Sequence, residues 1–426
     1  MQDADRGFIP HWIVHRLTAN YWVLAVCATV IALPFALALL WIDRAGAAQW
    51  LVDSDLSPIA TADTAKDFVG VAAGINAAFI TLYFSITLIV LSLAAGNLGV
   101  RLIDRWLQRR LVRVSLAGLS FTLVATLVAM MAIDAEADLA DTPLLLVAVV
   151  LLLQMVNIAM LAVSLHALGR TMFVDDSIDR IAADTAPPSR TLTAVPIPDA
   201  AHPHRLFAER EGYVEETNLD ALAKAFAAGR ARVLVHAAPG QFVLPGELLL
   251  SSPQAFAAKE ISHAVPVGPY RSDNQGSVFR VRLLVEIAAR ALSPAINDFY
   301  TALTCADKLS SVMDKHAHLW VDDGQALSCT DGPEIVLIGQ DFRSLFANPL
   351  SALRQAASAY PSVAIRLIEN YAKLSERHGS GASSGLSLFL AAQAREMRDH
   401  AVALAEHEGD KHDIMSAYDA GLAPAS

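Results

Sequence analysis

Four long apolar runs in the first 170 residues constrain the fold of this chain more than any other feature. Each run has about 20 or more residues and no Asp, Glu, Lys or Arg in its middle, which is enough for a helix to cross a hydrocarbon layer of about 30 Å. A helix is required because unpaired backbone groups cannot face lipid. Buried core helices of a soluble protein are the alternative, but such helices rarely run this far without a charge. The predicted spans are Tyr21–Ile42, Phe68–Leu98, Val114–Ile133 and Leu144–Leu168.

Composition agrees with a chain that lies partly in a lipid bilayer. Hydrophobic residues make up 54% and charged residues 18%, whereas charged residues make up about 25% of an ordinary soluble domain. The net charge of −11 argues against a nucleic-acid partner, because a basic surface is needed to neutralise phosphates. Cys27, Cys305 and Cys329 lie far apart in the sequence, so we expect neither a disulfide framework nor a cysteine metal site.

The loops between the predicted spans differ in charge. Five arginines lie in the 101–113 loop, whereas the 134–142 loop has no Lys or Arg, and the 43–67 loop has only Arg44 and Lys66. Because Lys and Arg are enriched in cytoplasmic loops, the arginine-rich loop is predicted to face the cytoplasm of a bacterial cell. An even number of spans then places the N-terminus and the C-terminus on the cytoplasmic side of the inner membrane.

The sequence beyond the spans has a mixed, water-soluble character. Five prolines lie between residues 186 and 205, which is typical of a linker. Short strand-like pieces separated by glycines follow it and favour a small barrel, and a mainly helical pattern begins near Val278. The fold class is therefore an α-helical membrane protein with four transmembrane helices plus a mixed cytoplasmic region, a small β-barrel-like subdomain followed by a mainly α-helical one. The expected parts are a tail (1–20), the transmembrane domain (21–170), a helical extension and proline-rich linker (171–205), a β-rich subdomain (206–255), a helical subdomain (256–415) and a tail (416–426).

A stripe of small and hydroxyl residues runs along the second predicted span. Its members recur at spacings of three, four and seven residues, so they share one helical face. Such a face either packs closely against another helix or forms the wall of a polar conduit where several copies of the chain meet. The residues singled out are Gly74, Ala78, Thr81, Ser85 and Ser92. Asn76, off this stripe, and Gln154 and Asn157 in the fourth span also need hydrogen-bonding partners.

A second polar motif lies in the segment ARALSPAINDFYTALTCADKL, residues 289–309. Proline disfavours a helical conformation in the residue before it, so one helix ends near Pro294. Asn297 or Asp298 can then cap the next helix. The motif is either a joint between two helices or a site that contacts a ligand, an ion or a neighbouring subunit. Its residues are Ser293, Pro294, Asn297, Asp298 and Thr301.

Three segments resemble a large family of uncharacterised bacterial membrane proteins, described only as a domain of unknown function. They are FSITLIVLSLAAGNLGVRLI, EGYVEE with PGQFVLPGELL, and LVEIAARALSPAINDFYTA, and the resemblance covers nearly the whole chain. Members of the family typically have Asn-Asp-Pro where this chain has Asn297-Asp298-Phe299. The resemblance implies an inner-membrane location and no established activity.

Two functions fit these observations. The first is a homo-oligomeric channel or small-solute conduit, lined by the second span and regulated by the cytoplasmic region. Uncharged spans suit passive flow, because pumps and voltage sensors normally have intramembrane charges. The second is a membrane-anchored sensor or scaffold whose soluble region binds a small ligand, an ion or a protein. No catalytic set, cofactor motif or metal-ligand spacing stands out, so we expect no enzyme.

Overall fold

The computed structural model describes residues 22–98, 110–170, 174–187, 190–198, 202–227, 232–329, 332–379 and 384–422. The chain divides into two compact units, Met1–Phe173 (unit 1) and Val174–Ser426 (unit 2).

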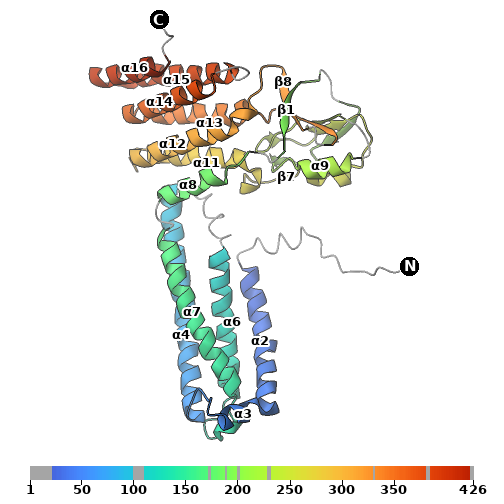
Figure 1. The fold of residues 1–426 in the computed structure, drawn as a ribbon, viewed down its shortest axis with the longest axis vertical. Coiled ribbons are helices and arrows are strands. Elements are labelled where there is room, and N and C mark those ends of the chain that lie inside the picture. The colour runs from blue at the N-terminus through green and yellow to red at the C-terminus, as the bar shows by residue number, and fades with distance from the viewer. Residues whose placement is uncertain are drawn as a thin grey trace. The chain divides into compact units, whose positions relative to one another are not determined.

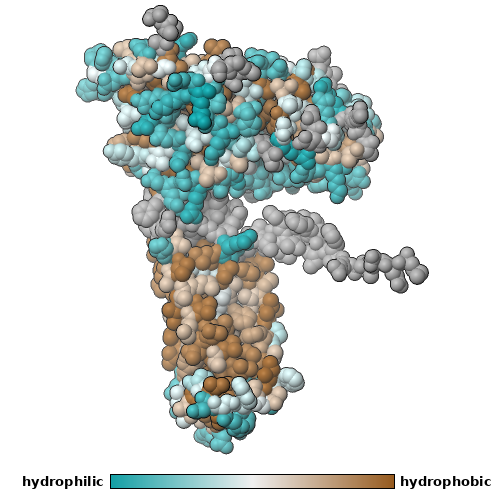
Figure 2. All heavy atoms as spheres, viewed as in Figure 1, coloured by the Kyte–Doolittle hydropathy of each residue, from teal (hydrophilic) through white to brown (hydrophobic). Residues whose placement is uncertain are grey.

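Four long helices dominate unit 1, and all four are long and apolar enough to cross a membrane. They are α2 (Val23–Ile42), α4 (Ala62–Leu98), α6 (Arg110–Ala132) and α7 (Leu144–Arg170), and they lie side by side in the blue-to-green part of Figure 1. Hydrophobic residues cover most of their visible face, shown brown in Figure 2. The predicted number and approximate positions of the apolar helices are therefore confirmed.

The ends of these helices differ from the predicted spans. Helix α2 continues through a π-helical turn, η1 (Asp43–Ala47), into α3 (Ala48–Asp53), and α4 begins at Ala62 instead of Phe68. Thr61 starts α4, because its hydroxyl accepts a hydrogen bond from the N–H of Thr64 at 3.2 Å. A prediction from hydrophobicity alone misses such polar turns at the ends of helices. Tyr21, the predicted start of the first span, lies outside the described residues.

The buried carboxylate of Asp43 caps a helix other than its own. Its two oxygens accept hydrogen bonds from the backbone N–H groups of Leu145 and Leu146, at 2.9 and 3.1 Å. These N–H groups belong to the first turn of α7, where no intrahelical acceptor exists. The carboxylate also complements the positive end of the α7 dipole. Asp43 thereby joins the end of α2 to the start of α7, with η2 (Leu139–Asp141) lying just before that start.

Five alanines contribute to a core cluster among the described residues of unit 1. Ala36, Ala65, Ala72, Ala125 and Ala129 are buried there together. Small residues allow helix backbones to approach closely, and dispersion forces then hold helices together in lipid. A second cluster contains Tyr83, Leu116 and Leu161.

Unit 2 contains two β-sheets. A six-stranded sheet has the order β1-β8-β9-β4-β6-β2, and a three-stranded sheet has the order β5-β3-β7. Only β4 and β9 pair in parallel; every other pairing given for the two sheets is antiparallel. The strands are β1 (Leu192–Pro196), β2 (His204–Phe207), β3 (Gly212–Val214), β4 (Arg232–Val235), β5 (Phe242–Val243), β6 (Leu248–Ser252), β7 (Val267–Gly268), β8 (Gln325–Cys329) and β9 (Glu334–Leu337).

The strands do not form the predicted barrel in the described part of the chain. Strands β1 and β2 are the two edges of the larger sheet, and β5 and β6, joined by one short turn, belong to different sheets. Moreover, β8 and β9 come from the region predicted to be mainly helical; β9 pairs with β4 of the β-rich region, and β8 pairs with β1 and β9. The β4–β9 pairing includes an ion pair between Arg232 and Glu334 at 2.7 Å. Pairings over such sequence distances cannot be read from local glycine turns.

Strand β1 lies inside the segment that was predicted to be a proline-rich linker. It pairs with β8 from Leu192↔Cys329 to Pro196↔Gln325. Proline is acceptable there because β1 is an edge strand, whose outer side needs no donor. The proline content of this segment therefore marks an edge strand as well as irregular chain.

Helices make up the rest of unit 2, and α11 to α16 form a stack in Figure 1. The helices are α8 (Val174–Asp184), α9 (Leu219–Ala225), α10 (Ala258–Ile261), α11 (Ser277–Ala291), α12 (Phe299–His316), α13 (Phe342–Ala357), α14 (Pro361–Arg377), α15 (Ser384–Leu404) and α16 (Glu408–Leu422), with short 3-10 turns η3 (Ser262–Ala264), η4 (Asp273–Gln275) and η5 (Ala317–Leu319). The tail predicted from 416 starts within α16, whose Ile414 and Tyr418 are buried. The guanidinium of Arg398 lies 4.2 Å from the ring centroid of Tyr418.

Candidate functional site

The small-residue stripe of α4 points away from the core of its own bundle. All five predicted stripe residues, Gly74, Ala78, Thr81, Ser85 and Ser92, are exposed. The buried residues of α4 include Val69, Asn76, Tyr83, Thr87 and Val90. At 3.6 residues per turn, the two sets centre on faces about 180° apart. A Cβ added to Gly74 would meet no atom within 4 Å.

The hydroxyl groups of the stripe are satisfied by their own helix. Thr81 donates its hydroxyl to the carbonyl of Ala77 at 3.0 Å, and Ser85 donates to the carbonyl of Thr81 at 2.9 Å. Such bonds let the stripe face an apolar surface without an unpaired donor. The side chain of Leu88, 64% exposed, lies beside the same face. The stripe is thus an outward face of small residues with large apolar residues, Val71, Leu88 and Ile89, beside it.

The polar residues that lie off the stripe meet in the interior of unit 1. The amide of Asn76 donates to Oε1 of Gln154 at 2.8 Å, and Asn157 donates to Oδ1 of Asn76 at 3.4 Å. Separately, the hydroxyls of Ser115 on α6 and Ser164 on α7 lie 2.6 Å apart. The sequence indicated that these amides need partners, and the structure pairs them with one another. This network joins α4 to α7 and does not border the stripe.

The second predicted motif forms the joint between α11 and α12. Asp298 is the N-cap of α12: Oδ1 accepts from the N–H of Thr301 at 3.1 Å and Oδ2 from its hydroxyl at 2.6 Å. Asn297 has a φ of 50°, a conformation that asparagine tolerates better than most residues. The carbonyl of Ser293 accepts from the N–H of Asn297 at 2.9 Å. The predicted cap is therefore confirmed at Asp298.

The surface beside this joint is partly apolar. Pro294 and Asn297 are exposed, as are Ile296, Phe299 and Tyr300, the last with 70% of its surface accessible. The rings of Phe299 and Tyr300 lie 4.2 Å apart at their centroids. The motif therefore presents both polar and aromatic groups to solvent.

A cavity of about 630 Å³ lies within unit 2, and sequence reasoning missed it. Its wall combines segments far apart in the sequence, among them the end of α8 near Asp184, the turn from 238 to 242, the start of α11, the end of α12 and the loop leading into α13. The sequence feature that could have pointed to this cavity is Gln275-Gly276, a polar residue and a glycine directly before helix α11. The turn approaches α11 so closely that a Cβ on Gly240 (φ 77°) would lie 2.8 Å from Val278 and 2.9 Å from Arg282.

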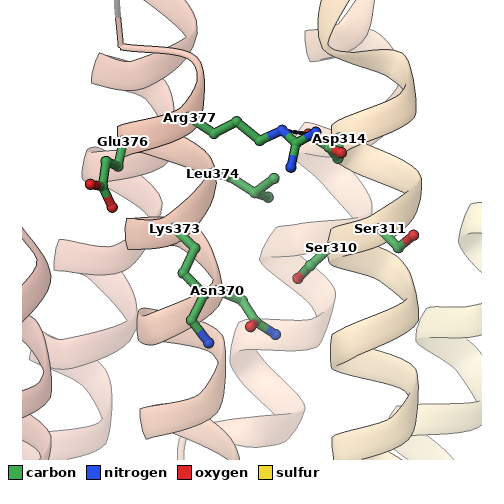
Figure 3. A pocket seen from close by; sticks show the side chains of 8 residues that line it. All are labelled: Ser310, Ser311, Asp314, Asn370, Lys373, Leu374, Glu376 and Arg377. Carbon is green, nitrogen blue, oxygen red and sulfur yellow. Dashed lines mark ion pairs between the residues drawn. The ribbon is translucent and has the colours of Figure 1, made fainter.

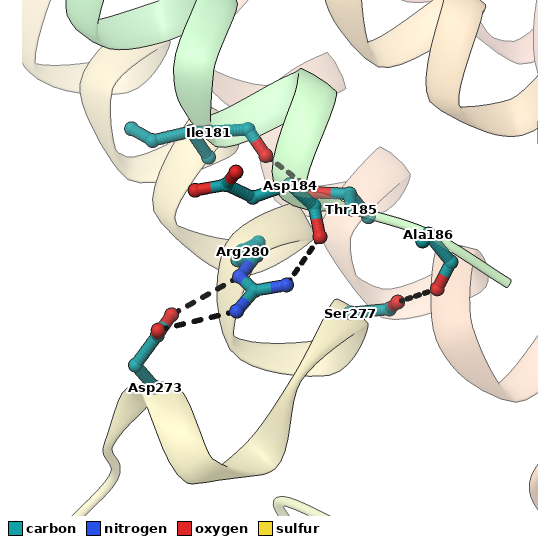
Figure 4. Close-up of polar contacts among 7 residues, drawn as sticks. All are labelled: Ile181, Asp184, Thr185, Ala186, Asp273, Ser277 and Arg280. Carbon is teal, nitrogen blue, oxygen red and sulfur yellow. Dashed lines mark hydrogen bonds and ion pairs between the residues drawn. The ribbon is translucent and has the colours of Figure 1, made fainter. Parts of the chain in front are cut away.

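Polar contacts fix the wall of this cavity, as Figure 4 shows. Arg280 binds both carboxylate oxygens of Asp273, at 3.1 and 3.2 Å, and also donates to the backbone carbonyl of Asp184. Ser277 donates its hydroxyl to the carbonyl of Ala186 at 3.0 Å. Across the cavity, Nη1 of Arg282 donates to the carbonyl of Gly240 at 3.0 Å. The start of α11 is thereby held against α8 and the 238–242 turn.

His316 also lines this cavity and is buried. Burial lowers its pKa, an effect that the carbonyls of Val312 and Ala186 partly offset. Its Nδ1 donates to the carbonyl of Val312 at 2.8 Å, and its ring lies edge-on to Phe346. Burial of His316 at the wall therefore favours the neutral form of its imidazole.

A second hollow, of about 590 Å³, lies between α12 and α14 (Figure 3). Asp314 in its wall accepts from Arg377 at 3.0 Å and from His378 at 2.9 Å. Asn370 donates to Asp307 at 2.9 Å. These pairings join two helices, so the hollow is explained by helix packing and surface ion pairs.

Comparison with known proteins gives one family and several relatives. The model of the family described as "Predicted membrane protein (DUF2254)" matches residues 18–373. Uncharacterized protein Mb1321c of Mycobacterium bovis and uncharacterized protein Rv1290c of Mycobacterium tuberculosis are each 30% identical over 282 residues, 58% of this chain and 52% of theirs. The chain thus spans about half the length of the curated relatives it matches. No solved structure matches it.

Proposed function

The chain belongs to the DUF2254 family of predicted membrane proteins, and from this premise we propose that it is a homo-oligomer whose copies meet through the α4 stripe and form a passive conduit for an ion or small solute. One observation carries the proposal: Gly74, Ala78, Thr81, Ser85 and Ser92 are exposed on the face of α4 opposite the bundle core.

The other outward faces of unit 1 differ from this stripe. Helix α7 exposes large apolar residues such as Leu152, Met155 and Val163, and α2 exposes Val30 and Leu37 in the same way. Large apolar side chains suit contact with lipid tails, whereas small ones favour close approach of a second helix. The contrast supports self-association through α4 instead of lipid contact along this face.

Passive flow fits the chemistry of the stripe. It offers hydroxyl groups and exposed backbone at glycines, and no charged residue between Gly70 and Ser92 that would serve a proton relay or voltage sensor. We place both termini in the cytoplasm of a bacterial cell, on the count of arginines in the 101–113 segment. Unit 2 then has a regulatory role and no enzymatic one.

Cross-linking and mass measurements test the oligomer directly. Cys27 is exposed whereas Cys305 and Cys329 are buried, so Cys27→Ser provides a background without an exposed cysteine. In that background, Ser85→Cys should form disulfide-linked dimers in membranes, and Ala159→Cys on the exposed face of α7 should not. A monomeric mass in mild detergent, together with equal cross-linking at both positions, would contradict self-association through the stripe.

Flux assays then separate conduction from assembly alone. Liposomes containing the purified protein should leak a monovalent ion, and Ser85→Leu should reduce the leak, because added volume on a close-packed face forces helices apart. Ala159→Leu adds similar volume on an outward face of α7 and should leave it unchanged. An oligomer without flux would favour the second candidate, a membrane-anchored sensor, which the cavity in unit 2 supports.

A further inference from the structure

The wall of the unit 2 cavity contains a buried amide that lacks hydrogen bonds. The side chain of Gln275 is 3% exposed, and both Nε2 and Oε1 are buried with no partner among the residues the structure describes. Buried amides are nearly always hydrogen bonded, so an unpaired one at a cavity calls for a missing partner. A bound molecule in the cavity can supply that partner.

The amide stands next to the amino end of a long helix. Helix α11 has 15 residues, and its N-cap residue, Gly276, has a φ of 57° and no side chain with which to cap the first turn. The first backbone N–H groups of a helix have no intrahelical acceptor and lie at the positive end of its dipole. Such an end binds phosphates and carboxylates well.

Two arginines and two acids are among the residues that line the cavity. Arg280 binds Asp273, and Arg282, further along α11, donates to the carbonyl of Gly240. Of the acids in the wall, Asp341 accepts from the N–H of Ser344 at 2.7 Å and so caps α13. The backbone carbonyl of Asp184 accepts from Arg280 (Figure 4).

The remaining wall is largely apolar and has room for more than a simple ion. Phe242, Val278, Leu319, Leu337 and Leu345 line it. A volume of about 630 Å³ is within the range of about 300–1,000 Å³ that is typical of pockets for small organic molecules. An occupant therefore needs an apolar body in addition to its charged group.

We propose that this cavity binds a small organic anion, a phosphate or carboxylate attached to an apolar body, at the amino end of α11. The Gln275 amide nitrogen donates to the anion together with the first N–H groups of α11, and the apolar body contacts Val278 and Leu337. Binding here does not depend on whether the α4 stripe conducts.

Thermal unfolding of the full-length protein in mild detergent tests the site with defined probes. Phenyl phosphate should raise the melting temperature in a saturable manner, inorganic phosphate should act only at higher concentration, and uncharged benzyl alcohol should not act. Dioctanoyl phosphatidic acid distinguishes the source of the anion. Stronger binding of this lipid than of phenyl phosphate assigns the site to a lipid headgroup, and the reverse order assigns it to a soluble metabolite.

Two substitutions at one position make the test specific. Gln275→Met keeps the size of the side chain and removes its donor, so it should weaken phenyl phosphate binding roughly 10-fold and raise the melting temperature of the unliganded protein. Gln275→Glu places a carboxylate beside the anion and should abolish binding. Gln325→Met, at an exposed position outside the cavity wall, should bind like the unmodified protein.

The proposal is wrong if neither phenyl phosphate nor phosphatidic acid binds. It is equally wrong if Gln275→Met and Gln275→Glu both bind phenyl phosphate as tightly as Gln325→Met. The second result would mean that the amide is satisfied by water and that any binding occurs elsewhere.

Discussion

Asn76 on α4 donates its side-chain amide to Oε1 of Gln154 on α7 across 2.8 Å, in the interior of unit 1. The same nitrogen donates to the carbonyl of Ala72 at 3.0 Å, and Asn157 donates to Oδ1 of Asn76 at 3.4 Å. Asn76 is thus the central member of a network that joins α4 to α7, through residues 78 positions apart in the chain. In an apolar interior these amides have no water as an alternative partner.

Replacing Asn76 by Leu should destabilise unit 1 by about 1–2 kcal/mol. The change keeps a similar volume but leaves Oε1 of Gln154 and Nδ2 of Asn157 without their partner. Unfolding by SDS in mixed micelles measures the loss. Gln154→Met should cost less, because Nε2 of Gln154 already has no partner in the described structure. Equal unfolding of Asn76→Leu and the unmodified protein would show that the network contributes no stability.

The parts of the fold that could be predicted are those that depend on neighbouring residues. The length of an apolar run marks a membrane helix, and Asp298 next to a proline turn marks a cap, because both depend on a few adjacent positions. The sheets were not predictable in this way. Strand β1 pairs with β8 across about 130 residues, and β4 pairs with β9 across about 100. No local pattern encodes such partners.

The candidate sites also divide into features that depend on neighbouring residues, which could be predicted, and features that depend on distant segments, which could not. The stripe of α4 could be found from spacing alone, but its exposure depends on which face packs against α6 and α7. The need of Asn76, Gln154 and Asn157 for partners was apparent from their place in apolar runs. The cavity beside Gln275 was not, because its wall combines α8, the 238–242 turn, α11 and the start of α13.

Reporter fusions should place both termini in the cytoplasm. Green fluorescent protein fused after Ser426 should fluoresce, and alkaline phosphatase fused there should be inactive. The acidic segment 134–142 provides the internal control, since a phosphatase fused after Asp138 should be active on the opposite side. The physical reason is that positively charged loops are retained on the cytoplasmic side. Phosphatase activity at the C-terminus would overturn this orientation.

Acidification should destabilise unit 2 partly through His316. Burial places its folded-state pKa below its ordinary value of 6.5. As pH falls below that value, the unfolded chain binds a proton that the folded chain does not, so the free energy of unfolding decreases. Above it, both states are neutral and His316 adds no pH dependence.

Replacing His316 by Asn removes this titration and keeps an N–H for the carbonyl of Val312. The variant should therefore lose less stability than the unmodified protein between about pH 7 and pH 5. His236, whose pKa burial also lowers, titrates in the same direction in both proteins, so the comparison isolates His316. Melting temperatures across this range provide the measurement, and parallel curves for the two proteins would exclude His316 as a contributor.

Replacing Asp298 by Ala should lower the stability of unit 2 by about 0.5–2 kcal/mol, the usual value of a helix cap. Both carboxylate oxygens accept from Thr301, so the geometry favours a capping role. Asp298→Asn should recover most of the loss, because asparagine caps about as well as aspartate. Thr301→Val should cost less than Asp298→Ala, since it removes the hydroxyl and keeps the capped N–H.

Oligomer mass distinguishes this capping role from a contact with a neighbouring subunit. Ile296, Phe299 and Tyr300 expose apolar surface around Asp298, so a subunit contact at this joint is the alternative. If Asp298 acts only as a helix cap, Asp298→Ala lowers the melting temperature and leaves the mass of the oligomer in mild detergent unaltered. A lower mass for Asp298→Ala that Asp298→Asn does not restore would instead assign the charge of Asp298 to the interface. The two variants differ from each other mainly in capping ability, and each differs from the unmodified protein in charge, so the pair separates the two roles.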